Sequence, residues 1–149
     1  MKLVIQRVSR ASVRVGEETV GLIGRGLLVL FGAEVGDTVE AAEEAARKVA
    51  GLRVFEDAGA RMNLALADVG GAVLAVSQFT LAADLSRGRR PGLERALRAP
   101  DAEPLYDRFV AALRQLGLTV ATGIFGASME VELVNEGPAT FLLELPPGP

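Results

Sequence analysis

Hydrophobic and polar residues alternate from residue 2 to residue 8, and this period of two is typical of a β-strand. Residues 12–15 and 19–23 flank Gly16-Glu17-Glu18, which predicts a hairpin. Residues 26–32 form a continuous apolar run bounded by glycines, which indicates a strand buried on both faces. The chain is therefore predicted to open with a β-sheet.

Two later segments have the features of amphipathic helices. Asp37 with Glu40 three residues later resembles a capping box, and acidic residues precede basic ones before Gly51, as the helix dipole favours. Pro104 suits the first turn of a second helix, and Gly117 suits its end. The apolar stripe of this second helix consists of Leu105, Phe109, Leu113 and Leu116.

Short strands are expected at residues 52–55, 72–76, 118–122, 128–134 and 140–145, with turns between them. Strands thus outnumber helices, and the two helices are separated by strands. We expect a single α+β domain over residues 1–145, with a curved, barrel-like, mostly antiparallel sheet and two main helices. The proline-rich residues 146–149 are expected to form a flexible tail.

Composition narrows the possible chemistry. The 149 residues are half apolar, which fits one domain with a substantial core. Cysteine and histidine are both absent, which excludes disulfides, thiolate nucleophiles, Cys/His zinc sites and Ser-His-Asp triads. The only lysines are Lys2 and Lys48, so a Ser-Lys dyad would require the fold to bring one of them to a serine. No metal or cofactor is expected.

Location and charge give further expectations. No apolar run approaches the roughly 20 residues of a membrane span, and the first residues lack signal-peptide features, so we expect a cytoplasmic protein. The net charge of −3 argues against a surface that binds nucleic acid throughout. Basic residues nevertheless cluster in one segment, which makes it either a phosphate contact or a solvated loop. They are Arg87, Arg89, Arg90, Arg95 and Arg98, opposed only by Glu94.

Two segments place small polar residues beside apolar strands, where sites are often built on a rigid scaffold. The first is Ser77-Gln78-Phe79-Thr80-Leu81, and the second is Asn135-Glu136-Gly137-Pro138-Ala139-Thr140. From spacing alone, the simpler interpretation is favoured for both: a strand end with solvent-facing side chains for the first, and an ordinary turn for the second.

The chain resembles the D-aminoacyl-tRNA deacylases in both segments. The Ser-Gln-x-x-Leu signature of that family is present as Ser77, Gln78 and Leu81, and the Asn-x-Gly-Pro-[Val/Phe]-Thr signature as Asn135, Gly137, Pro138 and Thr140. Ala139 stands where the family has a larger apolar residue. Further similarities are Gln6-Arg7-Val8, residues 24–30, Met62-Asn63, Gly88-Arg89-Arg90-Pro91, Pro104-Leu105-Tyr106 and Gly123-x-Phe125-Gly126-Ala127.

The resemblance implies a homodimeric hydrolase that acts on aminoacyl-tRNA. In the family the Gly-Pro bond is cis, and its loop enters the active site of the partner subunit, so Gly137 and Pro138 are expected to act across a dimer interface. Fixed backbone carbonyls there would receive the substrate α-amino group and reject an L side chain sterically, while glycine would be poorly excluded. Arg7 is similar to the arginine that steadies this loop, which also contains Asn135, Ala139 and Thr140.

Two mechanisms remain open for residues 77–80. The Thr80 hydroxyl is a candidate nucleophile, but it lacks an obvious base. Alternatively, backbone amides from Ser77 to Thr80, with Gln78 and Phe79 between them, form an oxyanion hole while the ribose 2′-hydroxyl activates water, as the resemblance implies. Arg87, Arg89 and Arg90 are the candidate RNA contacts. Two rival functions are a non-catalytic module that binds RNA ends and a small-molecule esterase or amidase that uses Thr80 or Ser77.

Overall fold

In the computed structural model, which describes residues 1–147, the alternating N-terminal segment forms one long strand. This strand, β1 (Lys2–Val15), replaces the separate strand and hairpin arm predicted from the sequence. It pairs antiparallel with β3 (Gly26–Gly32) through its first half and with β2 (Glu18–Ile23) through its second half. The last strand, β8 (Glu130–Glu144), is antiparallel to β1 over almost its whole length.

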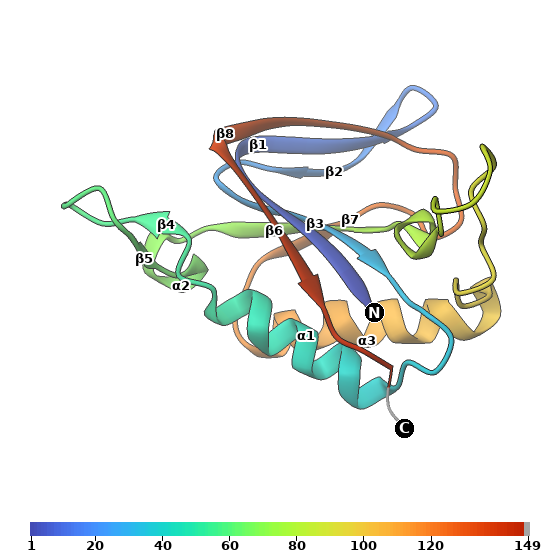
Figure 1. The fold of residues 1–149 in the computed structure, drawn as a ribbon. Helices are drawn as coiled ribbons and strands as arrows, with labels where there is room; N and C mark the ends of the chain where they lie inside the picture. Colours follow the sequence, from blue (N-terminus) through green and yellow to red (C-terminus); the bar gives the residue numbers. More distant parts are fainter. Residues whose placement is uncertain (148–149) are drawn as a thin grey trace.

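The rest of the main sheet is parallel. Strand β6 (Ala72–Ser77) is parallel to β3, and β7 (Val120–Thr122) is parallel to β6. A Cβ atom added to Gly21 of β2 would lie 2.5 Å from the carbonyl oxygen of Thr122 in β7, so the two ends of the strand order meet. The sheet is therefore curved and nearly closed, mostly antiparallel as expected, with a parallel section around β6 (Figure 1).

Hydrophobic residues of β3 enter two separate cores. Leu27, Val29 and Phe31 pack in the larger core between the sheet and the helices. Leu28 belongs to the smaller core enclosed by the curved sheet, together with Val8 of β1. The continuous apolar run at residues 26–32 was thus correctly interpreted as a strand buried on both faces.

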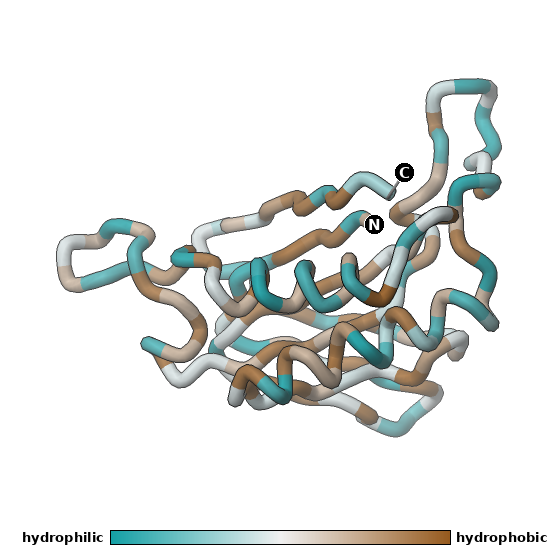
Figure 2. The backbone as a smooth tube through the Cα atoms, turned by 90° about the horizontal axis from the view of Figure 1, so that it is seen from below, coloured by the Kyte–Doolittle hydropathy of each residue, from teal (hydrophilic) through white to brown (hydrophobic). Residues whose placement is uncertain are grey.

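The two main helices, α1 (Val39–Gly51) and α3 (Ala99–Gln115), lie on the same side of the sheet (Figure 1). Apolar and polar stretches alternate along both helices, as expected for half-buried helices (Figure 2). The Asp37–Glu40 capping box is wrong, because Thr38 caps α1 and accepts a hydrogen bond from the Ala41 amide. The Asp37 carboxylate instead accepts hydrogen bonds from the buried Met1 amino group and the Glu34 amide.

The start of α3 also differs from the prediction. The helix begins at Ala99, and Pro104 lies inside it rather than in the first turn. The first-turn proline is Pro100, which the apolar stripe alone could not indicate because it precedes the stripe.

Three smaller elements complete the fold. Strands β4 (Phe55–Glu56) and β5 (Met62–Leu64) form a short hairpin, so the expected strand at residues 52–55 is shifted. A single helical turn, α2 (Leu66–Val69), precedes β6, and a 3₁₀ turn, η1 (Phe79–Ala82), follows it. Pro147 of the expected tail lies against Gly36, and residues 148–149 are outside the described part of the chain.

The prediction of separate strands at residues 128–134 and 140–145 is also wrong, because both belong to β8. Gln6 of β1 pairs with Thr140, and Val8 pairs with Asn135. Between these two pairs, β8 has four residues, 136–139, where β1 has only Arg7. The regular pairing of the two strands continues before and after these residues. The resulting bulge bends β8 sharply (Figure 1) and projects the Gly137–Pro138 segment from the sheet.

Candidate active site

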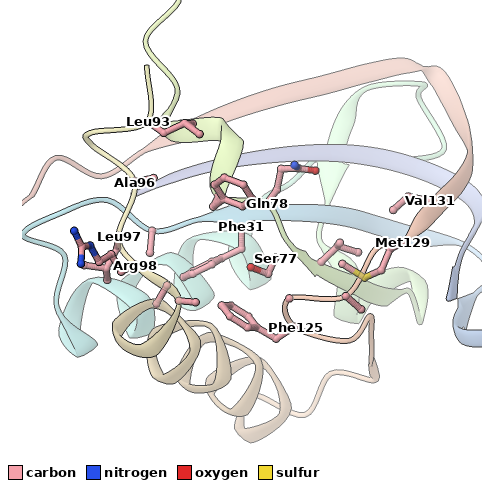
Figure 3. Close-up of a pocket in the computed structure, with 17 residues that line it drawn as sticks. Phe31, Ser77, Gln78, Leu93, Ala96, Leu97, Arg98, Phe125, Met129 and Val131 are labelled. Carbon is pink, nitrogen blue, oxygen red and sulfur yellow. The ribbon is translucent and has the colours of Figure 1, made fainter. Parts of the chain in front are cut away.

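A cavity of about 540 Å³ opens at the carboxyl ends of the parallel strands β3 and β6 (Figure 3). Ligands of open α/β sheets characteristically bind beyond the carboxyl ends of such strands. The walls come from β3, β6, the loop before α3, the start of α3, the 123–129 loop and β8. The lining residues are Phe31, Ala33, Val76, Ser77, Gln78, Phe79, Leu93, Ala96, Leu97, Arg98, Ala99, Ala102, Phe125, Gly126, Ala127, Met129 and Val131.

The segment predicted as catalytic lies at the edge of this cavity. Ser77 is the last residue of β6, and the Gln78 amide donates a 2.7 Å hydrogen bond to the Phe31 carbonyl, which ties the strand end to β3. The chain then turns into η1, whose first residue, Phe79, is 55% exposed. Ser77, Gln78 and Phe79 all line the cavity, so the structure brings these predicted residues together.

The backbone amides of this segment are not equivalent. The Gln78 amide is occupied by Phe31, which removes it from the oxyanion hole proposed over residues 77–80. The first N–H groups of a helical turn have no partner within that turn. Phe79 and Thr80 begin η1, so their amides are the donors best placed for a ligand oxygen.

Thr80 does not line the cavity as the other predicted catalytic residues do. Its hydroxyl accepts a 2.6 Å hydrogen bond from the Gln78 side-chain amide. An amide N–H cannot remove a proton, and among residues 1–147 no basic group hydrogen bonds to this hydroxyl. This geometry favours a positioning role for Thr80 over that of an activated nucleophile.

Aromatic residues form the floor of the cavity. Phe31 contacts Tyr106 with ring centroids 5.9 Å apart, and Tyr106 contacts Phe125 at the same distance. The Tyr106 hydroxyl donates a 2.7 Å hydrogen bond to the Ala75 carbonyl of β6, and burial raises the pKa of this phenol. Tyr106 therefore packs against both aromatic rings that line the cavity, and its hydroxyl ties α3 to β6 at Ala75, two residues before Ser77.

Sequence reasoning did not assign most of this floor. A signal was nevertheless present, because the tripeptide Phe-Gly-Ala occurs at residues 31–33 and again at residues 125–127. Both copies face the same cavity, which is lined by Phe31, Ala33, Phe125, Gly126 and Ala127. The repeat marks the two loops that bound the site.

The second predicted segment, residues 135–140, is held rigidly by its neighbours. Arg7 is only 5% exposed, and it donates hydrogen bonds to the Glu136 carbonyl at 3.2 Å and to the Val54 carbonyl at 2.7 Å. A Cβ atom on Gly137, where φ is +126°, would lie 2.9 Å from Arg7 Nη2. The Gly137–Pro138 peptide bond is cis.

Side chains at the two ends of the segment close it. Asn135 Oδ1 accepts a hydrogen bond from the Ala139 backbone amide at 3.0 Å, and Asn135 Nδ2 donates to Thr140 Oγ1 at 2.9 Å. The Gln6 side chain donates to the same hydroxyl. Ala139 is buried, so the small residue at this position faces the interior rather than a ligand.

The two predicted segments do not meet within one chain. Neither Gly137 nor Pro138 lines the cavity. Along the shared register, Arg7 pairs with Leu27, which pairs with Val73, four residues before Ser77. At roughly 3.3 Å per residue this separates the segments by about 13 Å along the sheet. In Figure 1 the bend of β8 lies at the left side of the main sheet and the yellow-green η1 at its right side.

The predicted RNA contacts lie on the loop between η1 and α3. Arg87, Arg89 and Arg90 are exposed there, at the tip of a segment closed by two backbone hydrogen bonds between Asp84 and Gly92. Within residues 1–147, no cluster of acidic side chains has the form of a metal site. In the same described part of the chain, no helix is long and apolar enough to cross a bilayer.

Comparisons with known proteins agree with the resemblance. Residues 4–144 match the family described as D-Tyr-tRNA(Tyr) deacylase. The chain is 59% identical to the D-aminoacyl-tRNA deacylase of Symbiobacterium thermophilum, over 97% of this chain and 95% of that protein. It is 57% identical to the protein of the same name from Syntrophotalea carbinolica, over 97% of each.

Solved structures support the same fold. The structure titled "c-Myc DNA Unwinding Element Binding Protein" has a TM-score of 0.92 and 41% identity, covering 98% of this chain and 99% of that one. A probable eukaryotic D-amino acid tRNA deacylase has a TM-score of 0.82 at 19% identity, covering 97% and 98% respectively, and shows the fold alone. With a family match over nearly its whole length and relatives of this identity, the chain belongs to the D-Tyr-tRNA(Tyr) deacylase family.

Proposed function

We propose that this protein hydrolyses the ester bond between a D-amino acid and the 3′ end of tRNA. The family and the names of the related proteins supply the reaction class. The observation that carries the proposal is the apolar cavity at the end of β6, because Phe79, the first residue of η1, lines it and Thr80 follows in the same turn. Such an arrangement suits a flat nucleoside in the cavity and an ester carbonyl at the amides.

Catalysis in this proposal is electrostatic. The two amides polarise the ester carbonyl and stabilise the oxyanion that develops on it, and each such donor is worth about 3 kcal/mol. The ribose 2′-hydroxyl beside the ester positions the attacking water, which agrees with the absence of histidine and cysteine from the chain. The Gln78 side chain donates a hydrogen bond to the Thr80 hydroxyl. In this proposal that bond fixes η1 and does not activate the hydroxyl as a nucleophile.

Selection of the D-enantiomer is assigned to the segment 135–140 of a second copy of the chain. Hydrogen bonds that involve Arg7, Asn135 and Thr140 fix its backbone. The backbone therefore does not move aside for a substrate side chain. An L-amino acid would direct its side chain into this backbone and be excluded, whereas a D-amino acid would direct its side chain away. Glycine has no side chain and would not be excluded. The distance between the segment and the cavity within one chain supports a site shared across a homodimer.

The reaction is tested with purified protein and D-tyrosyl-tRNA carrying a labelled amino acid. We expect release of D-tyrosine well above the uncatalysed rate, with many turnovers per protein. Tight binding without release would instead support a non-catalytic module for RNA ends. Equal activity on the methyl ester of D-tyrosine would support a small-molecule esterase, because the cavity would then contribute nothing to substrate choice.

A further inference from the structure

The loop between η1 and α3 forms an arginine arm, which we define as residues 84–98. It resembles a hairpin at its outer part, where Asp84 and Gly92 exchange backbone hydrogen bonds of 2.8 and 2.9 Å. Arg87, Arg89 and Arg90 all lie between these two residues and are exposed. The tip is therefore a fixed cationic projection rather than a free stretch of chain.

The arm is attached directly to the cavity wall. The Leu97 amide donates to the Ala33 carbonyl at 3.1 Å, and both residues line the cavity. At the inner end of the arm, Arg98 lines the cavity as well (Figure 3). Arg98 follows Arg90 by eight positions, so the tip lies at most about 28 Å from the rim. The tip is thus held within a limited distance of the cavity.

The charges at the tip are unopposed, whereas the protein as a whole is acidic with a net charge of −3. Within residues 1–147, none of the three tip arginines takes part in an ion pair. Arg95, nearer the inner end of the arm, acts electrostatically on Asp84. Hydrogen bonds from Ser86 and then the charge of Arg95 lower the pKa of the Asp84 carboxyl. The tip therefore carries three exposed cations without an ion-pair partner.

Resting on the proposed function, we propose that the arginine arm binds the phosphates of the acceptor helix of tRNA while the cavity holds its 3′ terminal residue. A polyanion is the partner that fits a row of unpaired guanidinium groups on an acidic protein. Arginine side chains also suit phosphate because their planar donors form paired hydrogen bonds with it. Contacts to phosphate carry no sequence information, so the arm accepts acceptor helices of any sequence.

The test measures binding of uncharged tRNA as a function of salt concentration. We expect the triple variant Arg87→Ser, Arg89→Ser, Arg90→Ser to bind tRNA at least about tenfold more weakly at low salt. The slope of log affinity against log salt should fall by about two to three, because each arginine that neutralises a phosphate contributes about one to it. Binding of the trinucleotide CCA should be unchanged, because it occupies the cavity and does not reach the three arginines at the tip of the arm.

Two further variants separate charge from other effects. The triple variant Arg87→Lys, Arg89→Lys, Arg90→Lys should keep most of the salt slope, since lysine retains the charge. A control with the same change of net charge, Arg10→Ser, Arg47→Ser, Lys48→Ser, removes exposed cations of β1 and α1 and should bind tRNA like the parent protein.

The proposal is overturned if the serine variant of the arm binds tRNA with the affinity and slope of the parent. It is equally overturned if the control variant binds as weakly as the serine variant, or if CCA binding falls in parallel. The measurement does not require hydrolysis, so it separates the two claims. Arm-dependent binding by a protein without deacylase activity would contradict the proposed function and leave the arm assigned to RNA.

Discussion

At the scale of single residues, the proposed site depends on Arg7 and on the first amides of η1. Arg7 is a buried cation that donates hydrogen bonds to two backbone carbonyls, one in segment 135–140 and one before β4. It therefore connects the segment 135–140 to the β4–β5 hairpin. Removal of a charged donor from such a position costs about 1.5–3 kcal/mol per hydrogen bond.

We expect Arg7→Lys to lower the free energy of unfolding by about 2–3 kcal/mol, because an ammonium group cannot reproduce the forked geometry of a guanidinium. The rate ratio for D- over L-tyrosyl-tRNA should fall as the segment loosens. Arg10→Lys, on an exposed position of the same strand, is the matched control and should change neither quantity. Denaturant unfolding and single-turnover hydrolysis measure the two effects. An unchanged ratio in a destabilised Arg7 variant would show that Arg7 has no part in selection.

Thr80→Ala should lower the rate of hydrolysis by less than about tenfold, because it removes one hydrogen bond to Gln78 and no nucleophile. A tRNA ending in 2′-deoxyadenosine should react at least about a hundredfold more slowly, since it lacks the group that positions water. Both rates are measured at saturating enzyme. Normal cleavage of the deoxy substrate together with an inactive Thr80→Ala variant would reverse the assignment and make Thr80 the nucleophile.

At the scale of elements, the near closure of the sheet depends on Gly21. A side chain there would meet the Thr122 carbonyl, whereas a Cβ atom added to the nearby Gly24 meets nothing within 4 Å. The close approach brings β2 to β7 and encloses the smaller core around Leu74. It also fixes the start of the 123–129 loop, which supplies one wall of the cavity.

We expect Gly21→Ala to lower the free energy of unfolding by about 1–3 kcal/mol, the usual cost of forcing extra volume into packed structure. Gly24→Ala should lie within about 0.5 kcal/mol of the parent protein, since it occupies open space. Thermal unfolding of the two variants side by side gives the comparison. Equal stability of the two would show that β2 and β7 are further apart than the contact with Thr122 requires.

The strands and main helices were largely predictable because each depends on a local pattern. The apolar run of β3, the polar end of β6 and the helix before Gly51 have clear periodicity or boundaries. The errors concern long-range pairing. Residues 135–140 contain turn-forming residues, and only the pairing of β1 with both halves of β8 makes them a bulge in one strand.

The candidate site was predictable to a similar degree. Ser77, Gln78 and Phe79 were correctly placed at a strand end, and the structure adds that they face a cavity. The occupied amide of Gln78 could not be foreseen, because its partner Phe31 is distant in the sequence. The alternating pattern alone makes Arg7 look like a surface arginine, but the family resemblance predicted that it steadies the segment 135–140, and its hydrogen bond to the Glu136 carbonyl agrees. Its second partner, the Val54 carbonyl, was not predicted, because it is distant in the sequence.

At the scale of the whole molecule, the proposed site requires two copies of the chain. The segment 135–140 and the cavity lie apart within one chain, so each site would combine the cavity of one copy with the segment of the other. A dimer of this kind holds two equivalent sites related by twofold symmetry. This arrangement predicts how defects in different chains combine.

A heterodimer tests this prediction, with Ala127→Trp filling the cavity of one chain and Gly137→Val disrupting the segment of the other. Each homodimeric variant should be inactive or unselective. The heterodimer should recover about half of the parental activity, because one of its two shared sites contains only intact parts. If cavity and segment instead acted within one chain, every site would carry a defect and no activity would return.

The most direct test of the account compares hydrolysis of D-tyrosyl-tRNA and L-tyrosyl-tRNA prepared on the same tRNA, at equal enzyme concentration. A rigid backbone segment that blocks one side of the stereocentre predicts fast release of D-tyrosine and release of L-tyrosine close to the uncatalysed rate. Hydrolysis of both substrates at similar rates would contradict it, because the site would then contain no element that distinguishes the two hands.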